Sequence, residues 1–333
     1  MGDYNRFNDE PLDDEISLVG GIEAHSELGE DLYLAGKSMY ELGQYVKARP
    51  NLEGALKYGK TEAAYYLGEL YYSGLGTERD YARAYGYYQR AQNIGIADVY
   101  YKLGRMSLDG NGTAEDYAKA KEYLLKAIEM DSVMALTDLG WLYERENNYD
   151  EAVRYYKLAA EKGRTVAMYN LGNLYWFGRG VEENEAEAFR YYSMAESDES
   201  IERLYRLGWM YKNGRGTEIN YAKAHEYLHR ALATESDNEQ YQSYALNCLG
   251  ILCENGQGCT KNMKKAAALY IAGAMLGNEA AMYNLALLYE SGDDDVEQNL
   301  YIAYMMYKEA ADLGDKDAKR KLADGKWDEY KLN

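Results

Sequence analysis

The segment HEYLH, which runs from His225 to His229, combines the side chains that catalytic zinc sites use. In hydrolases with an H-E-x-x-H motif, the two histidines lie on one face of a helix and bind Zn²⁺, and the glutamate, here Glu226, activates a zinc-bound water. Such a site also needs a third protein ligand and an open coordination position. His25 is the only other histidine, and Glu235 is a downstream alternative. A zinc-dependent hydrolase that uses His225, Glu226 and His229 is therefore one hypothesis for the chain.

The three cysteines are a second set of residues with chemical potential. Cys248, Cys253 and Cys259 fall in one segment, and their number and spacing match neither a disulfide framework nor a standard zinc site. Unpaired cysteines commonly pack as small hydrophobic side chains. We therefore predict buried free thiols, no cofactor and no metal site, with His225 and His229 as the only candidate pair of metal ligands.

Charge and hydropathy restrict the partners and the location. The net charge is −19, and residues 1–31 supply nearly half of it, with ten acidic side chains against one arginine. An acidic chain without a basic patch is repelled by nucleic acid and by anionic lipid, so we expect a protein or peptide partner, for which a basic surface is the better match. The sequence has no run of 18 apolar residues and no signal peptide, which predicts a cytoplasmic protein.

A repeated pattern organises the chain, which at 333 residues is too long for one ordinary compact core. Leu-Gly recurs at intervals of 32 to 42 residues, usually with Ala four residues before the Leu and Tyr three residues after the Gly, as on one face of a helix. A Gly-x-Gly then ends this first helix in five units, since glycine tolerates the left-handed conformation of a helix C-cap. An Asp or Asn follows as the expected N-cap of a second helix. The Leu-Gly pairs begin at Leu67, Leu103, Leu139, Leu171, Leu207 and Leu249.

This repeat also explains the residues around HEYLH. The second helix reads ARAYGYYQRA at residues 82–91, AKAKEYLLKA at 118–127 and AKAHEYLHRA at 222–231, with Ala at the third and last letters each time. The two imidazoles occupy positions that vary between units, so the motif does not by itself require a catalytic role.

The pattern A-x-x-x-L-G-x-x-Y-x-x-G-x-G followed by D/N-x-x-x-A resembles the Sel1-like repeat, a relative of the tetratricopeptide repeat, over residues 26–314. The resemblance implies an all-α fold, a right-handed α-solenoid of about eight stacked helix hairpins and about sixteen helices. We expect an acidic N-terminal arm at residues 1–25 and a C-terminal capping helix or tail at residues 315–333. The unit with six extra residues is expected to have a longer first helix or a longer preceding loop.

The same resemblance places the first helix of each hairpin along a concave face and the second helix on the outer face. The groove residues that it implies are Trp141, Tyr169, Asn173, Trp176, Tyr205, Trp209, Lys212 and Arg105. Aromatic rings with a polar edge suit a surface that becomes dry on binding, and the cations could meet a carboxylate. The alternative is that the rings only pack between neighbouring helices.

The leading functional hypothesis is a non-enzymatic scaffold or adaptor that binds a peptide or partner protein in this groove, centred on repeats four to six. An inhibitor or immunity-type protein that binds a basic enzyme or toxin is the first alternative, because an acidic surface steers fast association with a basic one. The zinc-dependent hydrolase is the second alternative.

Overall fold

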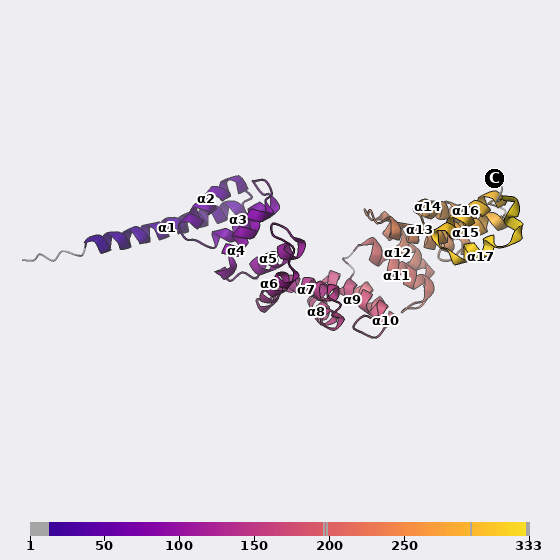
Figure 1. Cartoon of the computed structure of the whole chain (residues 1–333), viewed down its shortest axis with the longest axis horizontal. Coiled ribbons are helices and arrows are strands. Elements are labelled where there is room, and N and C mark those ends of the chain that lie inside the picture. The colour runs from indigo at the N-terminus through magenta and orange to yellow at the C-terminus, as the bar shows by residue number, and fades with distance from the viewer. Residues whose placement is uncertain (1–12, 196, 198, 294, 331–333) are drawn as a thin grey trace, which may run out of the picture. The chain divides into compact units, whose positions relative to one another are not determined.

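The computed structural model describes residues 13–195, 197, 199–293 and 295–330, and all of the regular structure in these residues is helical (Figure 1). The chain divides into two compact units, Met1–Ala159 and Ala160–Asn333, and α8 (Tyr149–Glu161) crosses the boundary. The other described helices of the first unit are α1 (Asp13–Glu41), α2 (Tyr45–Lys57), α3 (Ala63–Ser73), α4 (Tyr81–Arg90), the 3₁₀ helix η1 (Gln92–Ile94), α5 (Ala97–Asp109), α6 (Tyr117–Glu129) and α7 (Val133–Arg145).

The second unit is built in the same way. Its described helices are α9 (Thr165–Phe177), α10 (Glu185–Met194), α11 (Ile201–Asn213), α12 (Tyr221–Ala233), α13 (Glu239–Asn255), α14 (Met263–Met275), α15 (Glu279–Ser291), α16 (Leu300–Leu313), α17 (Lys316–Leu322) and the 3₁₀ helix η2 (Gly325–Tyr330). Consecutive helices pair as hairpins, such as α3 with α4 in the first unit and α11 with α12 in the second. Within each unit, each hairpin packs against the next one along the chain. The predicted all-α solenoid of paired helices is confirmed.

The recurrent Leu-Gly marks the place where the two helices of a hairpin approach most closely. A Cβ atom on Gly68 of α3 would lie 2.6 Å from the ring of Tyr88 on α4, well inside ordinary van der Waals contact. The same approach recurs between Gly104 and Leu124, Gly140 and Tyr156, Gly172 and Tyr192, Gly208 and Leu228, and Gly250 and Tyr270. The glycine is therefore a packing requirement of these six hairpins, each of which fills its interior with a large side chain of the second helix.

The two glycines of Gly-x-Gly have different roles. The first, such as Gly110 with φ of 68°, caps the helix in the left-handed conformation. The second presses on the first turn of the preceding hairpin's second helix: a Cβ atom on Gly112 would overlap the backbone carbonyl of Tyr81, where α4 begins. The same contact joins Gly76 to Tyr45, Gly216 to Glu185 and Gly258 to Tyr221. The second glycine therefore allows consecutive repeats to pack in direct backbone contact.

The polar caps and the irregular repeat also follow the sequence. Each predicted N-cap side chain accepts a hydrogen bond from the backbone N–H three residues further on, which satisfies one of the free donors of the first turn. These caps are Asp80, Asp116, Asn184, Asn220, Asn262 and Asn299. The extra residues of the seventh unit lengthen its first helix, since α13 has 17 residues where α11 has 13.

The C-terminal residues are held by a buried tryptophan. Trp327 of η2 is fully buried, and its ring lies 5.5 Å from that of Tyr307 on α16, measured between centroids. The charged side chains Lys316, Asp317, Lys319 and Arg320 of α17 are exposed. At the other end, the boundary expected at residue 25 falls inside α1, and residues 1–12 of the expected arm lie outside the described residues.

None of the helices in the described part of the chain is both long enough and apolar enough to cross a membrane.

Candidate functional site

Two of the predicted groove tryptophans meet in the second unit. Trp176 lies at the end of α9 and Trp209 in the middle of α11, on the first helices of neighbouring hairpins. Their rings are 5.6 Å apart between centroids and nearly perpendicular, at 87°, which is a favourable edge-to-face arrangement. Both side chains are half-buried. The structure therefore brings two of the predicted groove residues from neighbouring repeats into contact.

A hollow of about 120 Å³ opens beside this pair. Its lining residues are Trp176, Tyr205, Arg206, Trp209 and Met210. The local cause is the Leu-Gly step: Gly208 faces Leu228 inside the hairpin, so the next residue along α11, Trp209, is turned away from that contact. The hollow has room for the tip of one apolar side chain rather than for a large ligand.

Arg206 gives this hollow its charge. Its guanidinium lies 5.6 Å from the centre of the Phe177 ring and 5.9 Å from that of Tyr192, so the cation sits among aromatic rings. Among the described residues no carboxylate forms an ion pair with it, and its Nε atom is buried without a hydrogen-bond partner. Burial opposes the charge, yet the neighbouring phenols Tyr192, Tyr169 and Tyr241 raise the pKa of Arg206, which keeps it protonated.

The phenols themselves cannot neutralise that cation. Burial raises the pKa of Tyr169, Tyr192 and Tyr205 above the ordinary value, so that all three remain uncharged at neutral pH. The half-buried cavity therefore offers a positive charge together with apolar surface. A group with a carboxylate beside an apolar side chain is its chemical complement.

Other predicted groove residues of the second unit contribute to packing. The Tyr192 hydroxyl donates a hydrogen bond of 2.8 Å to Oδ1 of Asn173, so this oxygen already has a partner within the hairpin. Tyr169 packs beside Tyr192 at 5.7 Å between ring centroids. Lys212 donates to Oδ1 of the adjacent Asn213 at 3.4 Å, and its half-buried side chain does not line the hollow.

The remaining two predicted groove residues lie in the first unit. Arg105 forms ion pairs with Asp138 at 3.2 Å and with Asp109 at 3.0 Å, so its charge is already compensated. Trp141 has Arg145 over its ring at 5.0 Å. Neither residue lines the hollow of the second unit. The sequence gave no signal that Arg105 is paired, whereas no carboxylate among the described residues pairs with Arg206.

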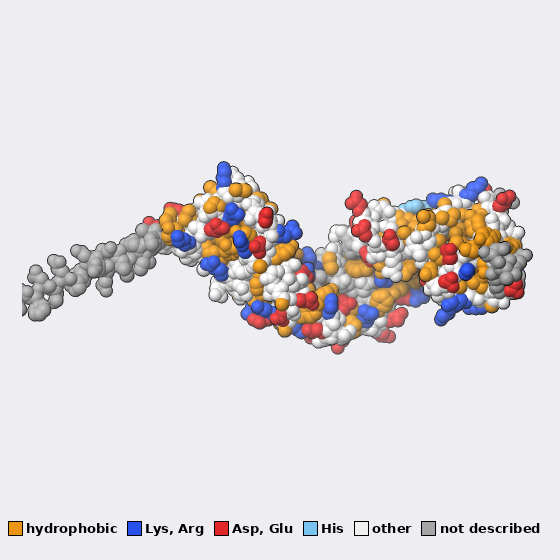
Figure 2. All heavy atoms as spheres, turned by 45° about the horizontal axis from the view of Figure 1, so that its top comes forward, with side chains coloured by type: hydrophobic (Ala, Val, Ile, Leu, Met, Phe, Trp, Pro, Cys, Tyr) orange, Lys and Arg blue, Asp and Glu red, His pale blue; other side chains and the backbone are white. Residues whose placement is uncertain are grey.

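The HEYLH segment lies on α12, the second helix of its hairpin. The rings of His225 and His229 are 4.4 Å apart between centroids, as expected for one helix face. Glu226, the proposed base, has a side chain 61% exposed and pairs with Arg230 at 3.7 Å. The structure thus brings the two imidazoles together and directs the carboxylate to solvent. Figure 2 shows acidic and basic side chains interspersed over the face drawn, with no large patch of one sign.

These features define the protein as an α-solenoid of helix-hairpin repeats. Within this class the chain belongs to the Sel1 repeat family, because eight consecutive segments match the Sel1 repeat. The matching residues are 22–60, 61–91, 97–132, 133–163, 165–197, 204–233, 243–278 and 279–315. Repeats of this kind generally act in protein–protein interaction and not in catalysis.

Solved structures agree with this assignment. The protective antigen c5321 of uropathogenic Escherichia coli is 28% identical with a TM-score of 0.77, over 90% of this chain and 66% of that chain. The chain therefore spans just under two thirds of the length of that relative. A Sel1 repeat protein from Oxalobacter formigenes is 24% identical with a TM-score of 0.56, over 96% of this chain and 95% of the other. No curated protein matches the chain.

Proposed function

We propose that the protein is a non-enzymatic interaction scaffold that binds an extended peptide or a segment of a partner protein. The contact point is the hollow between α9 and α11. The single observation that carries the proposal is Arg206, a protonated cation beside Trp176 and Trp209 that has no carboxylate partner among the described residues. The preferred element of the partner is an apolar side chain next to a carboxylate, either a C-terminus or an acidic residue. The apolar group enters between the indoles, and the carboxylate receives hydrogen bonds from the guanidinium.

The energetics favour binding at this place over other parts of the surface. Tryptophan and arginine are the residues that most often dominate binding energies when they line a desolvated pocket. A carboxylate that pairs with Arg206 would also satisfy the buried Nε atom, for which no described residue supplies a hydrogen-bond partner. Trp141 and Arg105 belong to the wider groove that the family resemblance implies, and they are a second place to test.

A peptide selection tests the proposal even while the natural partner is unidentified. Random peptides with free C-terminal carboxylates are selected on the immobilised full chain and, in parallel, on the Trp209→Ala variant. We expect enrichment of peptides with an apolar residue beside a carboxylate on the parent protein and its loss on the variant. Enrichment of the same peptides on both proteins would show that the hollow is not the binding site.

Two further variants sharpen this experiment. Arg206→Met keeps an apolar side chain of similar length and removes the charge, so it should retain apolar peptides but lose the preference for a carboxylate. Tyr301→Ala is the matched aromatic control, because Tyr301 lies on α16, a second helix, and is 53% exposed. We expect the selected peptides to bind Tyr301→Ala as they bind the parent.

The net charge of −19 favours a second candidate, an inhibitor or immunity-type protein for a basic enzyme or toxin. This candidate predicts an association rate that falls steeply with salt, whereas a hollow-centred peptide interaction depends mainly on Trp176 and Trp209. The two functions are separated by which of these perturbations removes binding.

A further inference from the structure

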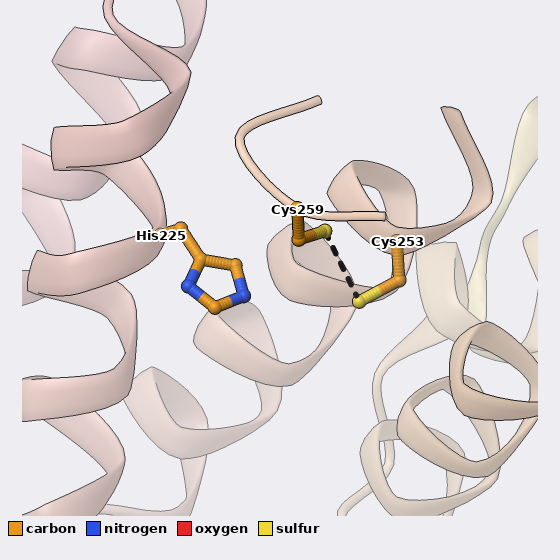
Figure 3. A group of neighbouring side chains, drawn as sticks. All are labelled: His225, Cys253 and Cys259. Atoms are coloured by element: carbon orange, nitrogen blue, oxygen red, sulfur yellow. Dashed lines mark hydrogen bonds between the residues drawn. The ribbon is translucent and has the colours of Figure 1, made fainter. Parts of the chain in front are cut away.

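A group of three metal-binding side chains forms where two consecutive hairpins of the second unit meet, away from the hollow. His225 comes from α12, Cys253 from the last turns of α13, and Cys259 from the loop that follows α13. One ligand atom from each residue lies within 4.8 Å of the other two. Figure 3 shows the imidazole of His225 directed toward the two sulfur atoms.

The repeat itself produces this meeting. Gly258, the second glycine of the Gly-x-Gly after α13, presses on the backbone of Tyr221 at the start of α12. His225 lies one turn further along α12, and Cys259 directly follows the glycine. Any residue at these two positions of consecutive repeats would be brought close, and only here are they a histidine and a cysteine.

The distances fit a tetrahedral metal. Two thiolates bound to Zn²⁺ at about 2.3 Å each are about 3.8 Å apart in tetrahedral geometry. Sγ of Cys253 and Sγ of Cys259 are separated by 3.8 Å. A zinc-bound nitrogen would lie about 3.5 Å from each sulfur, so the imidazole has to approach by at most about 1.3 Å from the present limit of 4.8 Å.

The electrostatic state of the side chains is also compatible with a metal. Nε2 of His225 is buried and has no hydrogen-bond partner among the described residues, which leaves it free to coordinate. Burial, His229 and Lys265 lower the pKa of His225, so the imidazole is neutral at physiological pH, as a metal ligand must be. Burial and the neighbouring Cys259 raise the pKa of Cys253, so metal binding would displace a proton from this thiol. Lys265 of α14 adds a positive charge that favours the thiolates once they form.

We propose that His225, Cys253 and Cys259 form a site for a borderline or soft divalent metal, with Zn²⁺ as the preferred ion. His229, one turn further along the same face of α12, supplies the fourth ligand by rotation of its exposed side chain. Two sulfur and two nitrogen ligands in a tetrahedron are typical of structural zinc sites, which are closed to substrate. The site goes beyond the proposed scaffold function and does not depend on it.

A metal ion in this site would link two neighbouring repeats and stabilise the interface between them. A solenoid is stabilised largely by the interfaces between consecutive units, and the ligands come from α12 on one side and from α13 with its loop on the other. Glu226, which a zinc hydrolase would need as its base, pairs with Arg230 instead. The metal therefore binds α12 to the next hairpin and does not activate a water.

Cobalt titration of the reduced, chelator-treated full chain tests this proposal. Co²⁺ bound by two thiolates in a tetrahedral site gives intense visible bands and a thiolate-to-metal charge-transfer band in the near ultraviolet. We expect both to saturate at one metal ion per chain and to disappear when Zn²⁺ is added. We also expect Zn²⁺ to raise the thermal unfolding midpoint of the parent protein. Absence of the bands in the reduced protein would overturn the proposal.

Single substitutions assign the ligands. Cys253→Ser, Cys259→Ser and His225→Gln should each abolish the charge-transfer band or lower the cobalt affinity about 100-fold or more. Cys248→Ser is the matched control, since Cys248 is a buried cysteine of the same helix outside the group, and it should bind cobalt as the parent does. His229→Gln should weaken binding, and an unchanged affinity would overturn the assignment of the fourth ligand.

Two checks keep the result interpretable. Circular dichroism of each variant shows whether the helices are retained, and Cys259→Ser, at a half-buried loop position, is the variant least able to disturb the fold. Mass spectrometry of the protein without reductant shows whether Cys253 and Cys259 form a disulfide. A disulfide together with no cobalt binding by the reduced protein would identify a redox pair and contradict the metal site.

Discussion

Two glycines of the same hairpin allow the packing of the repeat to be measured against an internal reference. Gly68 is the glycine of the Leu-Gly step on α3, and a Cβ atom there would lie 2.6 Å from the nearest ring atom of Tyr88. Gly86 is inside α4, and a Cβ atom there would have nothing within 4 Å. The perturbation is a methyl group, added as Gly68→Ala in one variant and as Gly86→Ala in the other.

The two substitutions are expected to change the free energy of unfolding in opposite directions. Replacing glycine by alanine within a helix stabilises it by about 1 kcal/mol in both variants. At Gly68 the methyl group also requires the Tyr88 ring to retreat by about 1 Å to reach normal contact. Tyr88 is fully buried and its hydroxyl donates to Glu69, so it cannot easily move. Overpacking of this kind costs about 1–3 kcal/mol. Gly68→Ala should therefore be about 0–2 kcal/mol less stable than the parent, and Gly86→Ala about 1 kcal/mol more stable.

The assay has to be local, because an array of repeats can unfold in parts. Hydrogen exchange of the amides in α3 and α4 gives the free energy of opening of this hairpin in each variant. The difference between the two variants isolates the packing cost of about 1–3 kcal/mol, since the helix-propensity gain is common to both. If Gly68→Ala stabilises the hairpin as much as Gly86→Ala does, a methyl group at Gly68 fits beside Tyr88, and the claim that the Leu-Gly step requires a glycine is refuted.

Three further predictions address the repeat interface, the C-terminal cap and association. Gly112→Ala should destabilise the neighbouring helices α4 and α5 more than Gly95→Ala does, as measured by hydrogen exchange, because both glycines have positive φ but only a Cβ on Gly112 meets a carbonyl of the preceding hairpin. Equal losses would refute a role of Gly112 in packing consecutive repeats together. Glu290 is partly buried, but hydrogen bonds from Lys326, Tyr307 and Lys321 lower its pKa from 4.5 to about 2. Its stabilising contribution should thus be complete above about pH 4.5 and lost as the pH falls toward 2, and Glu290→Gln should remove this part of the acid dependence. If the acidic arm steers a basic partner, deletion of residues 1–25 should slow association at low salt by about tenfold with little effect at high salt; an unchanged rate in stopped-flow mixing would contradict that steering.

Most of the fold could be predicted from the sequence because each repeat signal has one local cause. The Asp or Asn before the second helix predicts a cap, and all six predicted caps are formed. The first glycine of Gly-x-Gly predicts a left-handed C-cap, as at Gly110. Because the pattern recurs along the chain, each copy independently predicts the same pair of helices. The contact of the second glycine with the preceding hairpin was not predicted, because the sequence does not say which residues of the neighbouring repeat lie opposite.

The candidate site could be predicted only in part. The repeat resemblance places Trp176 and Trp209 on the first helices of neighbouring hairpins, but their direct contact was not predicted. The sequence does not distinguish Arg105, which two carboxylates compensate, from Arg206, which lies among aromatic rings. The difference depends on residues of other helices: Asp138 pairs with Arg105, and the rings of Phe177 and Tyr192 lie beside Arg206.

The cysteine and histidine group was missed for the same reason. The spacing of Cys253 and Cys259 within one segment does not match a standard zinc motif, which led to the prediction that they bind no metal. The third member of the group, His225, comes from the preceding repeat. The signal that could have found it is the repeat register, which places the residue after the second glycine beside the first turns of the preceding second helix.

The most direct test of the binding hollow is the dissociation constant of a peptide selected on the parent protein, measured by isothermal titration for the parent protein and for Trp176→Ala, Trp209→Ala and Tyr301→Ala. Loss of a central tryptophan anchor is expected to cost about 2 kcal/mol, or about 30-fold in affinity. The account predicts this weakening for Trp176→Ala and Trp209→Ala, with unchanged helical circular dichroism and parental affinity in Tyr301→Ala. Parental affinity in both tryptophan variants would contradict it.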